Sequence, residues 1–378
     1  MEGKIFDLAV IGSGVMGLGC VLQAAQDGKR VVVIDPANDE AKASWAAAGI
    51  LVTRGARNFL SPFREFYVRS IQLYPDWLQE VSKFSGQEVV LHQGGDYQIY
   101  NIGSPKGMEQ YQSKVKQLDR EHSQGFSVSD QMPGFLSEFS PLENLKAFHF
   151  PNEAYVQNRD LLLALRAACL KVGVHFIAEA PVGAWEYGAG TTKLSFTSDR
   201  LEARQILVAA GAWSSKVLTD LGFSAPMIPV KGQMCRIRKF YPEACMVHFN
   251  EDIYLVPRGD SLIVGATTEP GVWREGFDQT GEKYIHTHLD EFLPEIAKEP
   301  VESWAGFRPR TKDRLPWMGW IDEDKSWAIC TGHYKCGVSM APLAARCMAS
   351  LLKGEKPVVD LAPFDPWRRH GLSRLPSG

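Results

Sequence analysis

The sequence lacks several features that would assign it to a class at once. It has no run of about 18 apolar residues, the length at which a membrane-spanning helix is expected. Its net charge of −3 over 378 residues gives no basic excess for nucleic acid and no acidic tail. We therefore expect no membrane span and no nucleic-acid partner.

Cysteine is also sparse. The seven cysteines are odd in number and scattered, and no two of them form a C-x-x-C pair. This pattern predicts reduced thiols rather than a disulfide framework. The first residues carry no basic segment ahead of a long apolar run, so we expect no secretory signal and a cytoplasmic protein.

Hydrolase and metalloprotease motifs are missing as well, because neither G-x-S-x-G nor H-E-x-x-H occurs. What is present is an ordinary globular composition, with 45% hydrophobic and 22% charged residues. The chain is longer than one hydrophobic core usually organises, so two domains are predicted.

Residues 6–35 carry the most informative pattern. Two apolar runs without polar alternation, 6–11 and 30–35, predict buried parallel strands. Between them, apolar residues at helical spacing predict a helix that ends near Gly28. Strand, helix and strand in this order form a βαβ unit, which binds nucleotides at the first turn.

That turn has the pattern G-x-G-x-x-G. Gly12 permits the tight turn, Gly14 lets a pyrophosphate approach the backbone, and Gly17 lets the helix pack closely on the strand. Asp35 ends the second strand and can accept a hydrogen bond from a ribose 2′-OH, which disfavours NADP. We predict dinucleotide binding, with FAD and NAD both open at this point.

Similar pieces recur later in the chain. Residues 203–215 predict a strand, a turn at Gly211 and a helix, and residues 327–332 and 341–353 predict a further strand and helix. A nicotinamide enzyme usually completes its nucleotide domain contiguously, so this split layout favours a flavoprotein. The small residues of 41–52 indicate backbone lying against a flat or bulky group, or else the start of a helix capped by Ser44.

Other segments predict a second region. Residues 226–268 read as three strands rich in β-branched and aromatic residues. The segments 105–122 and 284–297 are further predicted helices, and a strongly periodic helix over 159–173 is expected to return the chain to the nucleotide-binding domain.

Together these motifs resemble the glycine oxidase branch of the D-amino-acid oxidase and sarcosine oxidase flavoenzymes. The matching segments occur in the family's order over nearly the whole chain: AVIGSGVMG, SWAAAGIL, ILVAAGAWS, IPVKGQ, YLVPRGDSLIVGAT, WAGFRPRTKDRLPWMG and GHYKCGVSMAP. The resemblance implies an α/β fold with a Rossmann-like FAD-binding domain and a substrate-binding domain built on a large antiparallel sheet. The FAD domain would comprise 1–85, 152–222 and 305–378, and the substrate domain 86–151 and 223–304.

Residues 303–320 place four cations among aromatic side chains. Pro309 fixes the backbone beside Arg308, and a guanidinium can bind a carboxylate through two parallel hydrogen bonds. The residues alone leave a structural ion pair open as the alternative. The resemblance implies that Arg308 holds the substrate carboxylate. The other cations of the segment are expected at the surface: Arg310, Lys312 and Arg314.

Three further residues are implied on the substrate side by the resemblance. Tyr254 would donate a hydrogen bond to the same carboxylate, with a half-buried strand aromatic as the alternative. His333 and Lys335 would approach the flavin edge. Glycine oxidases commonly have arginine where this chain has Lys335, and lysine keeps the charge without the bidentate fork. Trp45 is a further residue that could shape the pocket.

The implied cofactor is FAD. It is expected to be noncovalent, because the segment WAGFRPRTKD contains no cysteine, whereas sarcosine oxidases carry their flavin-linking thiol there. Cys330 and Cys336 flank the turn on the flavin side and are expected to be buried rather than redox-active. The residues expected to contact FAD are Gly12, Gly14, Val15, Met16, Gly17, Asp35, Ser44, Ala47, Ala48, Gly49, Val182, Gly211, Trp213, Gly332, His333, Gly337 and Val338.

The implied reaction is oxidation of a small amino acid or N-substituted glycine. Hydride transfer from Cα to flavin N5 leaves an imine that hydrolyses to an oxo acid, and O2 becomes H2O2. No protein base is obligatory when the amine is neutral, and the sequence shows no obvious one. The alternatives are an oxidase of a larger secondary amine or D-amino acid, a dehydrogenase with another acceptor, and a flavin-binding protein without activity. A homo-oligomer is compatible with the sequence.

Overall fold

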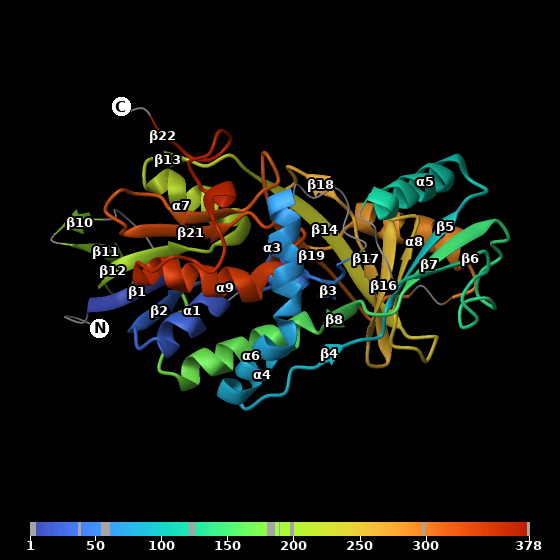
Figure 1. Cartoon of the computed structure of the whole chain (residues 1–378), viewed down its shortest axis with the longest axis horizontal. Coiled ribbons are helices and arrows are strands. Elements are labelled where there is room, and N and C mark those ends of the chain that lie inside the picture. The colour runs from blue at the N-terminus through green and yellow to red at the C-terminus, as the bar shows by residue number, and fades with distance from the viewer. Residues whose placement is uncertain are drawn as a thin grey trace.

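The computed structural model describes residues 5–36, 39–53, 61–120, 125–179, 186–188, 190–196, 200–296 and 299–375. Its two large sheets lie toward opposite ends of an elongated molecule (Figure 1). The predicted α/β class with a parallel and an antiparallel sheet is confirmed. Among the described helices, none combines the length and the apolarity needed to cross a membrane.

The first sheet is parallel at its centre, and its strands run in the order β9-β2-β1-β12-β21. Its central strands are buried, which explains why they read as uninterrupted apolar runs. The bounds of its members are β1 Ile5–Ile11, β2 Val31–Ile34, β9 His175–Ile177, β10 Glu186–Gly188, β11 Thr191–Ser195, β12 Arg200–Val208, β20 Trp317–Trp320 and β21 Trp327–Thr331.

Helices cover this sheet. The helix α1 (Val15–Gln26) packs against α9 (Gly337–Lys353) and α6 (Asn158–Lys171), and α4 (Tyr74–Ser85) packs against α6. The helix α3 (Ser61–Gln72) lies against α9. The helices predicted after Gly12 and over 159–173 are therefore present.

The start predicted for the last helix, residue 341, is wrong. The helix α9 begins at Gly337 and contains Pro342. Proline has no N–H to donate to the carbonyl four residues earlier, and that carbonyl, on Val338, instead accepts the hydroxyl of Tyr74 at 2.5 Å. The buried hydroxyl of Tyr74 thus satisfies the acceptor that Pro342 leaves open, so the helix continues through the proline.

The second sheet has nine strands and is antiparallel except where β5 and β15 pair in parallel. The three strands predicted within 226–268 are β14, β16 and β17, and β15 is an additional strand between β14 and β16 in the chain. The bounds are β5 Asp96–Asn101, β6 Ser127–Ser129, β7 Leu145–Phe150, β14 Met227–Arg238, β15 Met246–Phe249, β16 Ile253–Arg258, β17 Ser261–Gly265, β18 Glu269–Pro270 and β19 Glu302–Thr311.

The helix predicted over 284–297 is displaced. It is α8 (Gln279–Phe292), which Asp278 caps by accepting the N–H of Thr280 at 2.8 Å. The helix stops before Pro294 because the residue preceding a proline disfavours the helical conformation. The apolar face of α8 packs on one face of the antiparallel sheet. The helix α5 (Pro105–Arg120) packs on β5 and β7 through the aromatic cluster around Phe148.

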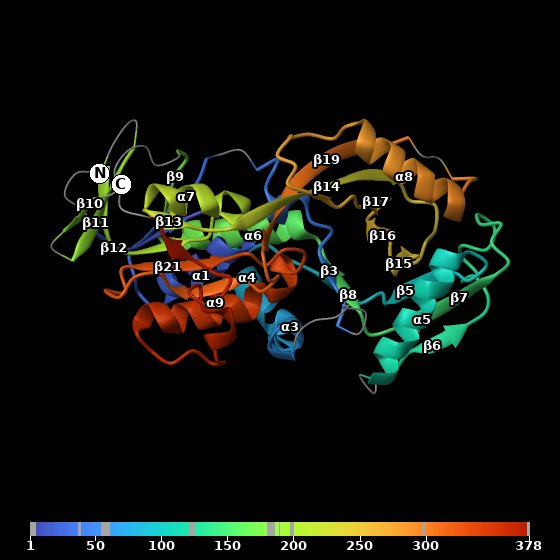
Figure 2. The same ribbon diagram turned by 90° about the horizontal axis from the view of Figure 1, so that it is seen from above.

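Two long strands connect the regions. The strands β14 and β19 pair in register over ten residues and run side by side toward the parallel sheet (Figure 2). The remaining elements are β3 Ile50–Leu51, β4 Leu91–His92, β8 Ala154–Val156, β13 Phe223–Ser224, β22 Ser373–Arg374, α2 Ala43–Ala46, α7 Ser214–Asp220 and the 3-10 turns η1 Gly211–Trp213 and η2 Ala362–Phe364. The predicted domain boundaries stay predictions, and the one at 304/305 falls within β19.

Candidate active site

A cavity of about 1020 Å³ is lined by residues from both large sheets. The turn after β1 and the small residues after α2 line one part of it, and strands β15, β16 and β19 line another. Groups predicted for a cofactor and for a substrate therefore share one cavity.

The glycine turn has the geometry that its sequence predicts. Gly12 has φ of +112°, a conformation that favours glycine, and a Cβ on Gly17 would lie 2.0 Å from the carbonyl oxygen of Gly12. Gly14 is the N-cap residue of α1. The glycines thus bring the N-terminus of α1 close to β1 and to the cavity, as phosphate binding at a helix N-terminus requires.

Two side chains complete this turn. The backbone N–H of Val15 donates to the hydroxyl of Ser44 at 3.1 Å. Asp35 accepts the N–H of Ser13 at 2.5 Å and pairs with the ammonium of Lys42 at 2.5 Å. The alternative in which Ser44 caps the following helix is wrong, because Lys42 is the N-cap residue of α2. Lys42 was not predicted, although it lies only seven residues beyond Asp35.

The described residues fit a dinucleotide as bulky as FAD. The lining beyond the glycine turn includes the run from Ala46 to Gly49, whose side chains are no larger than a methyl group. At Gly49, φ is +69° and a Cβ would meet the carbonyl of Val156 at 1.9 Å. Most predicted cofactor contacts line the cavity, namely Gly12, Gly14, Val15, Met16, Asp35, Ser44, Ala47, Ala48, Gly49, Gly211, Trp213, His333, Gly337 and Val338.

Three residues that were predicted to contact the cofactor are not among the described residues that line the cavity. Gly17 lies beneath the turn and acts through its close approach to Gly12. Gly332, with φ of +83°, forms the bend after β21, where a Cβ would meet Thr311 at 2.6 Å. Neither lines the cavity. Val182 lies outside the described residues.

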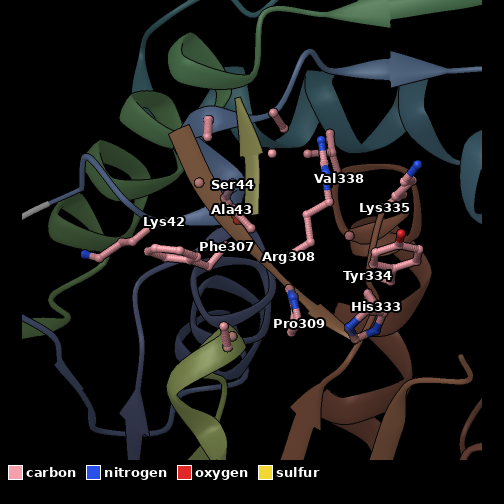
Figure 3. A pocket seen from close by; sticks show the side chains of 18 of the residues that line it. Lys42, Ala43, Ser44, Phe307, Arg308, Pro309, His333, Tyr334, Lys335 and Val338 are labelled. Carbon is pink, nitrogen blue, oxygen red and sulfur yellow. The ribbon is translucent and has the colours of Figure 1, made fainter. Parts of the chain in front are cut away.

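Arg308 faces the cavity from β19 (Figure 3). One N–H of its guanidinium donates to the carbonyl of Thr267 at 2.9 Å. The group lies directly over Gly232 on β14, where a Cβ would be 2.2 Å from Nη2. Among the described residues, no carboxylate forms an ion pair with Arg308. Most of its five donors therefore remain for a ligand.

Thr267 is itself held in place. Its hydroxyl accepts the backbone N–H of Gln233 at 2.9 Å and donates to Glu269 at 2.5 Å. The amide of Gln233 donates to the same carboxylate at 2.9 Å. This network fixes the carbonyl that orients the guanidinium of Arg308.

Tyr254 lines the same cavity from β16. It stands opposite Gly265 on β17, and a Cβ there would lie 2.9 Å from the phenol oxygen. Burial raises the pKa of Tyr254, while the charge of Arg308 acts in the opposite direction. The phenol is therefore a neutral donor that lies within the electrostatic influence of the arginine.

His333 and Lys335 come from the turn before α9. Figure 3 shows the side chains of Arg308 and Lys335 extending the same way, with the ring of His333 beside Pro309. The side chain of Lys335 is exposed to the cavity. Partial desolvation by the surrounding protein atoms nevertheless lowers the pKa of Lys335 to about 8, and the charge of Arg308 lowers it further by a smaller amount. His333 is buried, which lowers its pKa to about 3, and its Nε2 has no hydrogen-bond partner among the described residues.

Other residues of interest do not enter the cavity. Lys312 and Arg314 are exposed, and Arg310 is half-buried. The ring of Trp45 packs on the guanidinium of Arg159 at 4.9 Å and is not part of the cavity wall, so its expected effect on the pocket is not observed. Both flanking cysteines line the cavity and have free thiols; Cys330 is buried as expected, whereas Cys336 is only half-buried.

One polar pair in the cavity was not predicted. Nδ1 of His248, on β15, lies 2.7 Å from Oδ1 of the fully buried Asp96 on β5. Gln98 donates to the second oxygen of that carboxylate at 2.7 Å. His248 and Gln98 both line the cavity. Because Asp96 and His248 are far apart in the sequence, only the pairing of β5 with β15 reveals them.

Comparison with known proteins decides the family. The model of the FAD-dependent oxidoreductase family named DAO matches residues 7–351, nearly the whole chain. The chain belongs to this family. FAD is therefore its cofactor, in agreement with the fit of the glycine turn and the cavity.

Relatives of this oxidoreductase support the narrower resemblance. A glycine oxidase of Pseudomonas aeruginosa is 28% identical over 376 residues, covering 95% of this chain and 98% of its own. The glycine oxidase of Geobacillus kaustophilus is 27% identical and covers 97% and 98%. The crystal structure of glycine oxidase from Geobacillus kaustophilus superposes with a TM-score of 0.86 at 25% identity, covering 97% and 99%. The expected resemblance and the expected class, an FAD-dependent oxidoreductase related to amino-acid oxidases, are confirmed.

Proposed function

We propose that this oxidoreductase is an oxidase of a small amino acid or N-substituted glycine, with dioxygen as the electron acceptor. The observation that carries the proposal is Arg308, a guanidinium in the cavity without a carboxylate partner among the described residues. A substrate carboxylate matches its donors in charge and geometry. The similarity to glycine oxidases favours the same substrate class.

The protein groups would act mainly by positioning. Arg308 and Tyr254 would hold the carboxylate from two sides, which fixes the Cα–H of the substrate toward the cofactor part of the cavity. Lys335 would add positive charge, and it would do so fully only below a pH of about 8. Thr267 would keep the guanidinium in place.

The cofactor would be held by the turn from Gly12 to Val15, by the run from Ala46 to Gly49 and by the first turn of α9. The chemistry that FAD supplies when bound is acceptance of a hydride from Cα and return of the electrons to dioxygen as hydrogen peroxide. Hydrolysis of the imine then gives an oxo acid and ammonia or an amine. Noncovalent binding, a cytoplasmic location and a homo-oligomeric state stay predictions.

The test is an amine panel assayed for peroxide and, without oxygen, for bleaching of the flavin absorbance. The panel comprises glycine, sarcosine, D-alanine, D-proline and longer N-carboxymethyl amines. We expect bleaching by at least one small amino acid and one peroxide per turnover in air. Bleaching without peroxide would contradict an oxidase, and no bleaching by any member would contradict the substrate class.

A further inference from the structure

The Asp96–His248 pair lies on the same face of the second sheet as Arg308 and Tyr254, the proposed carboxylate clamp. His248 stands opposite Tyr254 in the pairing of β15 with β16, and opposite Gln98 in the pairing of β15 with β5. Directly opposite residues of neighbouring strands place their side chains on one face. The rings of His248 and Tyr254 are 6.0 Å apart between centroids. The imidazole is therefore the neighbour of the clamp's phenol.

The hydrogen bond to Asp96 determines which nitrogen is available. A carboxylate accepts hydrogen bonds, so Nδ1 of His248 carries the proton that it donates. In the neutral ring the lone pair then belongs to Nε2. Among the residues that the structure describes, no protein group bonds to Nε2, and the ring lines the cavity. A basic nitrogen thus faces the space next to the clamp.

An amino acid at neutral pH enters this space as a zwitterion. Hydride cannot leave Cα while the nitrogen is an ammonium, because the nitrogen lone pair must form the C=N bond of the imine. One N–H proton must therefore leave first. We propose that His248 accepts that proton at Nε2. One N–H bond of the substrate breaks and one N–H bond of the imidazole forms, with no change in oxidation state. The inference rests on the proposed function.

Asp96 is then a positioning residue. It fixes the tautomer of His248 and stabilises the imidazolium that forms, as a buried carboxylate does for other catalytic histidines. Gln98 in turn holds the carboxylate. Other titratable groups that line the cavity include Lys114 on α5, Glu251 and Asp252 between β15 and β16, Tyr254 on β16, Tyr284 on α8, Arg308 on β19, and His333 and Lys335 before α9.

The decisive variant is His248→Asn in the FAD-loaded enzyme. The asparagine amide can still donate to Asp96, which protects the fold, but it offers no basic nitrogen at the Nε2 position. We expect kcat/KM for the best amine of the panel to fall about 100-fold near neutral pH. The loss should shrink as pH rises, because the free amine then forms in solution. Asp96→Asn should also lower kcat/KM, because its amide can donate to Nδ1 of His248 and leave the proton on Nε2, where the free lone pair is needed, and this loss too should shrink as pH rises.

Two controls separate this role from a structural one. His149→Gln alters a histidine on the same sheet whose ring stacks on Tyr97 at 4.1 Å, outside the cavity lining, and should leave the profile unchanged. Glycolate, which has the carboxylate but no ammonium, should inhibit the wild type and His248→Asn equally. An unchanged rate in His248→Asn, or a loss that is equal at every pH, would overturn the proposal. Inactivity of the wild type toward the whole panel would instead overturn the proposed function.

Discussion

The parallel and antiparallel sheets serve the same cavity in different ways. The parallel sheet contributes mainly backbone, because its turn brings Gly12 and the N-terminus of α1 to the cavity. The antiparallel sheet contributes side chains, including Arg308, Tyr254 and His248. Under the proposed function, cofactor binding should therefore be sensitive to any added atom at a few glycines, whereas substrate binding should depend on the identity of individual side chains.

The largest effect is expected at Gly17, where the main chains of α1 and of the turn after β1 are in close contact. In Gly17→Val, a side chain would begin 2.0 Å from the carbonyl oxygen of Gly12, and β1 and α1 would have to separate. We expect a protein without bound FAD, measured by the flavin absorbance of the purified protein and its thermal unfolding.

Gly134→Ala is the matched control, because a Cβ at that position has no neighbour within 4 Å. It should bind FAD like the wild type. Full flavin content in Gly17→Val would show that close packing of this turn is not what holds the cofactor.

The second largest effect should concern substrate binding by the side chains of the antiparallel sheet and leave cofactor binding unchanged. Arg308→Ala removes the charge that would bind the carboxylate, a loss of about 3 kcal/mol or about 100-fold in kcat/KM. FAD content should be unchanged, since the guanidinium bonds to Thr267 and not to the glycine turn. Steady-state kinetics and absorbance measure the two quantities.

Lys312→Ala changes an exposed cation on the segment after β19 and serves as the control. Its kinetics should match those of the wild type. Unimpaired turnover in Arg308→Ala would show that Arg308 does not bind the substrate carboxylate.

A glycine on the antiparallel sheet sharpens the comparison. In Gly232→Ala the methyl group would lie 2.2 Å from Nη2 of Arg308, so the guanidinium must move while its charge remains. We expect kcat/KM to fall by about 10-fold with FAD retained, because misplacing a positioning group lowers the rate. Equal loss in this variant and in Arg308→Ala would mean that placement, rather than charge, accounts for the whole effect.

The smallest effect concerns pH. The pKa of Lys335 is lowered to about 8, so its positive charge is lost above that pH rather than near the ordinary value for lysine. We expect KM for an anionic-carboxylate substrate to rise a few-fold as pH passes 8. Lys335→Arg, which stays charged, should remove this rise, and its persistence in the arginine variant would assign it to another group.

The cofactor side of the cavity could be predicted from the sequence more completely than the substrate side. The βαβ unit around Gly12 was predictable because its strands, helix and glycines are contiguous, and Arg308 was identified through the family motif that contains it. The Asp96–His248 pair was not predictable, because neither residue lies in a recognisable sequence motif. Their contact depends on the register of β5 against β15. The start of α9 was missed because a proline normally opposes a helix, and the compensating hydroxyl of Tyr74 is remote in the chain.

The strand β19 has a consequence for divergence within the family. One edge of it pairs with β14 over ten residues, while the N–H of Phe307 donates to the carbonyl of Ala41 at 3.1 Å, beside the cofactor part of the cavity. Main-chain bonds on both sides therefore set how far Arg308 stands from the nucleotide turn. Substitution of the other side chains that line the cavity would not shift this spacing, so a change of amine specificity would leave the proposed reaction geometry intact.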